Sequence, residues 1–186
     1  LLTIKGIKIV YPSNAADMKG LLKAAFLDPN PVVMLEHKGL YWSKVPGTDE
    51  AKNTEPSRDY IIPLGKGNIV LEPDEDHIDS GESCCIITYG MGVYWAKAAA
   101  KNFPGQIEVI DLRTLFPLDE ALVFATVKKH GKCLVLTEEQ QDNSFAEALS
   151  GRISRSCFRY LDAPVEVLGA LNLPAVPMNI ILEQAM

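Results

Sequence analysis

Short apolar runs alternate with longer segments of helical periodicity along most of this chain, and this alternation limits the folds that it can adopt. Strands are expected at 84–88, 107–111, 133–137 and 165–169, with helical segments between them. A strand that is apolar throughout suits a parallel sheet covered on both faces, and the helices supply the crossovers. The pattern predicts an α/β fold with three α/β/α layers and a mostly parallel sheet.

The helical segments have clear end signals. Asp119 and Glu120 open a helix whose last turn is basic and is followed by Gly131, which suits both the helix dipole and a glycine stop. Ser144 and Glu147 form a capping-box pattern at the start of the next helix. The helix that starts near residue 92 is expected to bury one face, formed by Val93, Ala96, Ala100 and Phe103.

The N-terminal stretch is typical of a βαβ unit. A strand is expected at 7–10, a helix capped by Ser13 or Asn14, and a second strand at 32–35. The helix has an apolar face with helical spacing, formed by Met18, Leu21, Leu22 and Ala25. Two strands do not form a stable sheet alone, so we interpret this stretch as a partial unit that precedes the larger sheet.

Composition excludes several classes of protein. A net charge of −6 argues against a nucleic-acid partner. No apolar run approaches the roughly 20 residues of a membrane span, and no signal peptide opens the chain, which favours the cytoplasm or a matrix-like compartment. The four cysteines are expected to be buried, reduced thiols. The chain begins without methionine and ends at "ILEQAM", which resembles an unfinished helix, so a piece of a longer protein is expected.

The turn Gly90-Met91-Gly92 between a strand and a helix is the first candidate site. Its glycines imitate the start of a dinucleotide-binding fingerprint, and Asp111 stands at the end of the next strand, where an acidic residue would bind the ribose. Trp95 occupies the position of the third glycine and opposes that geometry. A tight turn without a nucleotide is the favoured interpretation, with nucleotide binding as the alternative.

Other polar residues give weaker signals. Asp111 and Arg113 alternate along an extended segment, which favours a structural ion pair or a subunit contact over catalysis. Residues 68–72 suggest an edge strand, and 72–82 an acidic surface loop whose aspartates lack calcium-loop spacing. His37 follows a buried strand and is therefore better placed for function than His77 or His130, because ligands of parallel sheets gather at the carboxyl ends of strands. A surface histidine without a function is still the slightly favoured interpretation of His37.

Several motifs occur in an ordered series: "IKIVYPSNAADMKGLLKAAFLDPNPVVMLEHKGLYW", "IPLGKGNIV", "ITYGMGVYWA", "IEVIDLRTLFPLDE" and "YLDAPVEVLG". With them the chain resembles the beta subunit, or the beta half of a fused chain, of thiamine-diphosphate-dependent 2-oxo acid dehydrogenases, a transketolase-like family. The resemblance extends over nearly the whole chain. One segment departs from it, because Thr137 stands where the usual "HEAPRTGGFGAEI" pattern has histidine.

The resemblance implies three parts: the end of the pyrimidine-binding domain (1–45), a linker (46–62) and a transketolase C-terminal domain (63–186). It implies a role in decarboxylating a 2-oxo acid and transferring the acyl group to lipoamide. In this family the main groups that bind thiamine diphosphate and its magnesium lie upstream or in the alpha part, so the chain alone is expected to be inactive and to bind neither. The implied partners are an alpha subunit or alpha half, a second beta copy and a dihydrolipoyl acyltransferase.

Two sets of site residues follow from the same resemblance. A structural potassium ion is expected in the intact enzyme at Ala25, Asp28 and Asn30, chiefly through backbone carbonyls, which a helix C-terminus leaves free. His37 and Lys38 are expected to line the entrance of the substrate channel. The rival hypotheses are a nucleotide-binding domain that uses the turn at Gly90 and Gly92, and a non-catalytic interaction module.

Overall fold

The computed structural model describes residues 1–173, so the expected helix at "ILEQAM" lies outside the described residues. Its larger sheet has five strands in the order β3-β5-β4-β7-β8. Four of them are mutually parallel: β4 (Cys84–Thr88), β5 (Ile107–Asp111), β7 (Cys133–Gln140) and β8 (Glu166–Ala170). The fifth, β3 (Asn68–Leu71), runs antiparallel at one edge. The expected mostly parallel sheet and its edge strand are confirmed.

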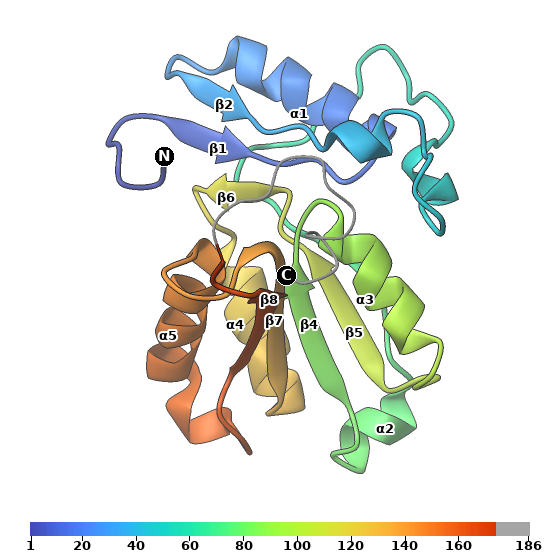
Figure 1. Ribbon diagram of the computed structural model, residues 1–186, viewed down its shortest axis with the longest axis vertical. Helices are drawn as coiled ribbons and strands as arrows, with labels where there is room; N and C mark the ends of the chain where they lie inside the picture. The colour runs from blue at the N-terminus through green and yellow to red at the C-terminus, as the bar shows by residue number, and fades with distance from the viewer. Residues whose placement is uncertain (174–186) are drawn as a thin grey trace.

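Helices cover both faces of this sheet (Figure 1). The crossover from β4 to β5 runs in one direction along the sheet, and those from β5 to β7 and from β7 to β8 run in the other. As a result α3 (Gly92–Ala100) packs on one face while α4 (Glu120–His130) and α5 (Phe145–Cys157) pack on the other. The predicted end signals are present: Asp119 caps α4, Ser144 caps α5, and Gly131 ends α4 in the left-handed conformation with φ 68°. The expected three-layer α/β/α architecture is confirmed.

The N-terminal βαβ unit forms a second, smaller sheet. Strands β1 (Lys8–Val10) and β2 (Val32–Met34) are parallel and are connected by α1 (Ala15–Leu27), which Asn14 caps. The third strand, β6 (Thr114–Phe116), comes from the segment after β5 and pairs antiparallel with β1. The sequence did not predict β6. Through β6, the part of the chain that builds the large sheet also contributes a strand to the small sheet (Figure 1).

Three local expectations are wrong. The acidic stretch at 72–82 is not only a loop, because it contains the short helix α2 (Glu75–Asp79). Phe103 lies beyond the end of α3 and is 51% exposed, so it is not part of the buried face. The buried side of α1 is also rotated from the expected face: Asp17, Gly20, Leu21 and Ala24 are buried, whereas Leu22 is 56% exposed.

The rotation of α1 has a physical cause. At Gly20 an added Cβ would lie 2.7 Å from Ile62 and 2.9 Å from Tyr60, so the helix presses its glycine directly against the segment 60–62. The Ile62 N–H donates to the Gly20 carbonyl over 3.2 Å, which fixes this approach. The stretch that connects the two sheets therefore packs against α1, with one short 3-10 helix at Asp49–Ala51 and a second, at Lys38–Leu40, just before it.

The four cysteines are free thiols, and Cys85, Cys133 and Cys157 are buried as expected, with Cys84 partly buried. Within residues 1–173, no helix is long and apolar enough to cross a membrane.

Candidate functional site at the junction of the two sheets

The carboxyl ends of the central strands meet the N-terminal unit. The chain leaves β4 toward β5 on one side, and β7 lies on its other side, so the connections diverge above β4 and β7. In open α/β sheets this point of divergence is where ligands gather. Here side chains of the N-terminal unit occupy the junction, and hydrogen bonds of Ser13, Asp17 and His37 cross it.

Asp111, at the end of β5, is completely buried at this junction. The Ser13 hydroxyl donates to its Oδ2 over 2.5 Å, and the Arg113 backbone N–H donates to its Oδ1 over 3.0 Å. Burial raises the pKa of Asp111 from 3.8 to about 6, and these two hydrogen bonds oppose the rise only in part. The buried Asp111 carboxylate thus joins the large sheet to Ser13 of the N-terminal unit.

Arg113 connects the same parts through a second carboxylate. Its Nε and Nη2 donate to the two oxygens of Asp17, each over 2.7 Å, and Asp17 is only 2% exposed. Such a planar, two-bond pair is the arrangement that a guanidinium forms best. Arg113 thus forms a structural ion pair, the role that the sequence favours for it, and its partner is Asp17 of α1. Arg113 adopts a φ of 55° to reach it.

Aromatic rings fill the rest of the junction. The ring of Tyr11 lies 5.4 Å from that of Tyr89, which in turn lies 5.8 Å from Phe145 in an edge-on arrangement. The hydroxyl of Tyr89 is 2.8 Å from Thr137 Oγ1, so the residue that departs from the family pattern anchors this cluster. Burial raises the pKa of Tyr11 to about 12, with a further contribution from the charge of Glu138.

His37 reaches the junction from the turn after β2. Its Nε2 lies 2.9 Å from Oε1 of Glu138, which follows Thr137 near the carboxyl end of β7. The hydrogen bond to this carboxylate raises the pKa of His37, although partial burial opposes the rise. The other ring nitrogen, Nδ1, is buried and has no hydrogen-bond partner in the described part of the chain. Lys38 is exposed beside it and forms no salt bridge within residues 1–173.

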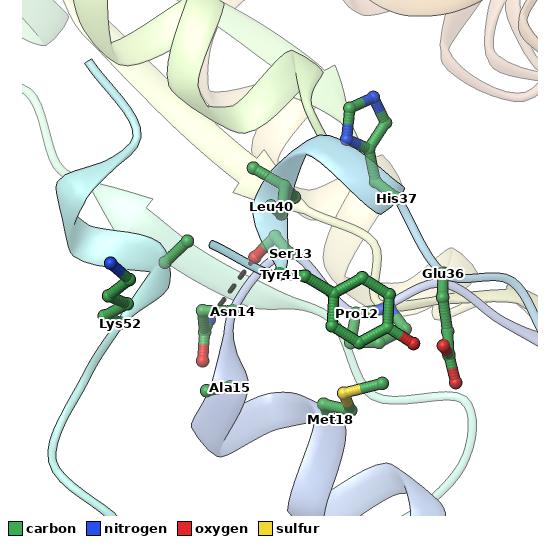
Figure 2. A pocket seen from close by; sticks show the side chains of 11 residues that line it. Pro12, Ser13, Asn14, Ala15, Met18, Glu36, His37, Leu40, Tyr41 and Lys52 are labelled. Carbon is green, nitrogen blue, oxygen red and sulfur yellow. Dashed lines mark hydrogen bonds between the residues drawn. The ribbon is translucent and has the colours of Figure 1, made fainter. Parts of the chain in front are cut away.

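A small pocket opens beside His37, between the start of α1 and the segment 36–52 (Figure 2). Its volume is about 100 Å³, and Met18 and Tyr41 face one another across it, with Glu36 and Lys52 at its sides. Cofactor pockets usually measure roughly 300 Å³ or more, so these walls alone do not enclose a thiamine diphosphate. Among the described residues no group of three or more acidic, histidine or cysteine side chains is arranged to hold a metal ion.

The predicted potassium ligands lie together at the end of α1. The N–H of Asp28 donates to the Ala25 carbonyl over 3.3 Å, and Asp28 Oδ1 accepts from the Asn30 N–H over 2.9 Å. Asp28 Oδ2 lies 2.5 Å from the ammonium group of Lys8, which lowers the pKa of Asp28. The carboxylate therefore already has a cation, and a metal at this position would depend on backbone carbonyls.

The turn at Gly90 and Gly92 has no room for a nucleotide. An added Cβ at Gly90, where φ is 57°, would lie 3.0 Å from the ring of Tyr11, so that ring covers the turn. An added Cβ at Gly92 would come within 2.0 Å of Thr88 Oγ1. Asp111, which a ribose would need, is buried and bonded to Ser13. The glycines serve the packing of the junction, and Trp95 is 42% exposed on the outer side of α3.

The other histidines lie elsewhere. His130 is buried at the end of α4, with its Nε2 3.0 Å from Glu108 Oε2 and its Nδ1 2.7 Å from Ser83 Oγ. His77 lies in α2 with its Nδ1 4.0 Å from Asp74. Of the residues that build the junction, sequence reasoning found His37, Asp111 and Arg113 and missed their partners. The departure from the family pattern at Thr137 was the one sequence signal near Glu138, the partner of His37.

Comparison with known proteins identifies the family. The model of the transketolase C-terminal domain matches residues 76–186, and that of the transketolase pyrimidine-binding domain matches residues 1–43. The chain belongs to the transketolase C-terminal domain family. The likeness to a solved structure titled "Split gene transketolase, inactive beta4 tetramer" supports the fold, with a TM-score of 0.67, 19% identity, and coverage of 98% of this chain and 53% of that one.

Curated relatives agree with the resemblance seen in the sequence. The chain is similar to the 2-oxoisovalerate dehydrogenase subunit beta of Bacillus subtilis, with 37% identity over 175 residues, which cover 92% of this chain and 49% of the relative. It is also similar to the pyruvate dehydrogenase E1 component subunit beta of Rhizobium meliloti, with 35% identity over 92% of this chain and 35% of the relative. The chain spans about half the length, or less, of these relatives.

Proposed function

We propose that this chain is part of the beta component of a thiamine-diphosphate-dependent 2-oxo acid dehydrogenase, the component that decarboxylates the acid and passes the acyl group to lipoamide. The observation that supports this most is the match of 37% identity to a 2-oxoisovalerate dehydrogenase beta subunit, which runs through 92% of the chain. The three parts proposed from the sequence (1–45, 46–62 and 63–186) agree with the order of the two matched domain models.

In this proposal the chain contributes assembly and not the reaction centre. When bound, thiamine diphosphate supplies the carbanion chemistry, and the protein supplies position and electrostatics. The residues beside His37 line a pocket of only about 100 Å³, which is too small for that cofactor, so these residues are not assigned to the reaction centre. Their role would be to hold the pyrimidine-binding segment against the large sheet through Asp111, Arg113 and Glu138.

The proposed partners are an alpha subunit or alpha half, a second beta copy and a dihydrolipoyl acyltransferase. The curated relatives are named as beta subunits, which supports a separate alpha part. His37 and Lys38 are proposed to lie at the substrate entrance, with the imidazole held by Glu138. The potassium site at Ala25, Asp28 and Asn30 and the cytoplasmic location remain predictions.

A calorimetric titration of the chain with thiamine diphosphate and magnesium tests the assignment of the reaction centre. We expect no heat of binding at micromolar cofactor and no decarboxylase activity from the chain alone. Micromolar binding would show that the cofactor site lies within this chain and would refute the proposal that the reaction centre lies outside it. A thermal-shift assay with NAD and NADP tests the nucleotide alternative, and a clear stabilisation by either would support that rival.

A pull-down with an alpha subunit of a related 2-oxoisovalerate dehydrogenase tests the assembly role. The unmodified chain should retain the alpha subunit, and an Arg113→Ala variant should retain less, because the N-terminal segment loses its attachment to the large sheet. A non-catalytic docking module would instead bind the subunit-binding domain of an acyltransferase while ignoring the alpha subunit.

A further inference from the structure

A second, larger cavity lies along helix α3 and shares no lining residue with the pocket beside His37. Its volume is about 300 Å³, which is roughly the volume of ten water molecules. The walls are the second half of α3, the connection 103–107, the end of β3 and the segment 47–50. A cavity of this size, at the lower end of the range for ligand pockets, suits a small metabolite.

Contacts within the chain hold these walls in place. Ala51, directly after the segment 47–50, is 3% exposed and packs in one apolar cluster with Tyr94 of α3. The ammonium group of Lys97 forms a salt bridge with the carboxylate of Glu50. The segment 47–50 is thus attached to α3 by an apolar and an ionic contact, and the cavity between them is already formed without a ligand.

One wall of the cavity is apolar. Leu71 and Ile107 come from the paired strands β3 and β5, and both are partly buried. Phe103 lines the same cavity and is 51% exposed. Its N–H donates to the Ala100 carbonyl over 2.9 Å, so the backbone that carries the ring is fixed at the end of α3. A ligand with an apolar side chain would cover this exposed ring.

Four charged residues also line the cavity, and two of them lack a partner of opposite charge. Lys97 and Glu50 neutralise one another, whereas Lys101 and Glu72 form no salt bridge within residues 1–173. Two lysines and two glutamates give the lining no net charge. A diphosphate would meet two carboxylates here, and like charges brought together in this way oppose binding. A ligand that carries one charge of each sign meets no such obstacle.

These features favour a small zwitterion with an apolar side chain. Its carboxylate would bind the ammonium group of Lys101, and its ammonium group would bind the carboxylate of Glu72. The side chain would lie against the apolar wall formed by Leu71, Phe103 and Ile107. We propose that the cavity along α3 is a binding site for an apolar α-amino acid.

Tyr94 connects this cavity to the junction of the two sheets. It lines the cavity, and its hydroxyl donates to the Ser13 carbonyl over 2.8 Å. A bound amino acid would therefore stabilise the attachment of the segment 47–50 to α3 and, through Tyr94, the position of Ser13. The proposal is independent of the enzymatic assignment, because it uses the shape and charge of the cavity and no step of the reaction.

An NMR titration of the full 186-residue chain with L-leucine tests this site. The amide signals of the second half of α3 and of 103–107 should shift, with a dissociation constant of about 1 mM or lower, as expected for a ligand of about nine non-hydrogen atoms. Three analogues each lack one group: isocaproate the ammonium group, isoamylamine the carboxylate, and glycine the side chain. Each should bind roughly tenfold more weakly or worse.

Substitutions of the two unpaired charges test the same contacts from the side of the protein. Lys101→Met and Glu72→Gln should each weaken leucine binding by roughly tenfold. Lys5→Met and Glu82→Gln are the matched controls, because both residues are exposed and lie outside the cavity, and they should leave the binding unchanged. Thermal melting without ligand shows whether each variant keeps its fold, and leucine should raise the melting temperature of the unmodified chain.

Several results would overturn the proposal. One is the absence of any shift at about 10 mM leucine, and another is a set of shifts confined to residues outside the cavity. Isocaproate that binds as tightly as leucine would show a site for simple carboxylates, and glycine that binds as tightly would show that the apolar wall plays no part. Folded Lys101→Met and Glu72→Gln variants that bind leucine as the unmodified chain does would overturn it too.

Discussion

Replacing Asp111 by asparagine tests whether the junction contains a carboxylate that is costly to ionise. Asp111 is completely buried, and its pKa is raised from 3.8 to about 6 because burial penalises the charged form. The amide side chain of the variant would retain an oxygen that accepts from Ser13, which lies 2.5 Å from Oδ2 of the aspartate, while removing the titrating group. The Nδ2 group of the variant replaces Oδ1 and loses the hydrogen bond from the Arg113 N–H, but this cost does not depend on pH, so the pH dependence isolates the charge.

The sign and size of the effect follow from proton linkage. The folded state has the higher pKa, so between about pH 4 and about pH 6 it binds more protons than the unfolded chain. The free energy of unfolding therefore falls as pH rises through this window and loses nothing further above it. A shift from 3.8 to about 6 corresponds to about 3 kcal/mol, at about 1.36 kcal/mol per pH unit.

Urea denaturation at several pH values between about 4 and about 8 measures this effect. The difference in unfolding free energy, Asp111→Asn minus unmodified chain, should grow by about 3 kcal/mol across the window and then remain level. Taking the difference cancels the other carboxylates, such as Asp28, whose lowered pKa makes stability rise with pH. The exposed Asp142→Asn is the control and should show a flat difference. A flat difference for Asp111→Asn as well would refute the reasoning.

Three smaller predictions concern the same region. Arg113→Ala leaves the Asp17 carboxylate, 2% exposed, without its cation and should lower the free energy of unfolding by about 3–5 kcal/mol; a loss below about 1 kcal/mol would contradict the buried pair. Gly92→Ala places a Cβ 2.0 Å from Thr88 Oγ1 and should cost about 1–3 kcal/mol, and Thr88→Ala in the same chain should recover most of it. Glu138→Gln should lower the pKa of its histidine partner in an NMR titration, and an unchanged value would show that the 2.9 Å contact does not hold the proton.

The large sheet could be predicted because its signals are local. Each strand is a continuous apolar run, and each helix end is marked by a cap within a few residues, as Asp119, Ser144 and Gly131 show. None of these inferences requires knowledge of a residue distant in sequence. The order of the strands was not predicted, because no local signal shows that β7 pairs with β4 and not with the preceding β5.

The small sheet and α1 were less predictable because distant residues decide them. The three residues of β6 give too short a pattern for a strand, and they pair with β1 only because the backbone turns at Arg113. The rotation of α1 depends on Asp17 meeting a guanidinium 96 positions away and on Gly20 meeting Ile62. An apolar pattern shows that a helix has an apolar face, but the residues that become buried depend on which other segments pack against the helix.

The candidate site divides in the same way. A histidine after a buried strand and a "DLR" stretch after another can be singled out from the sequence, because strand ends collect ligands. Whether these residues can contact a ligand depends on their partners, which lie far away in the sequence. Arg113 is neutralised by Asp17, and Asp111 is covered by Ser13, so neither is available to a substrate.

Four polar contacts at the junction share one property that bears on how the chain works. Each joins the N-terminal unit to the large sheet: Ser13 to Asp111, Asp17 to Arg113, His37 to Glu138, and the Tyr94 hydroxyl, which donates to the Ser13 carbonyl over 2.8 Å. Because they join the same two bodies, a shift of α1 strains all of them together. The glycine turn that suggests a nucleotide in the sequence is shaped to admit Tyr11 into this set. The motif residues therefore fix the N-terminal unit in one position against the large sheet.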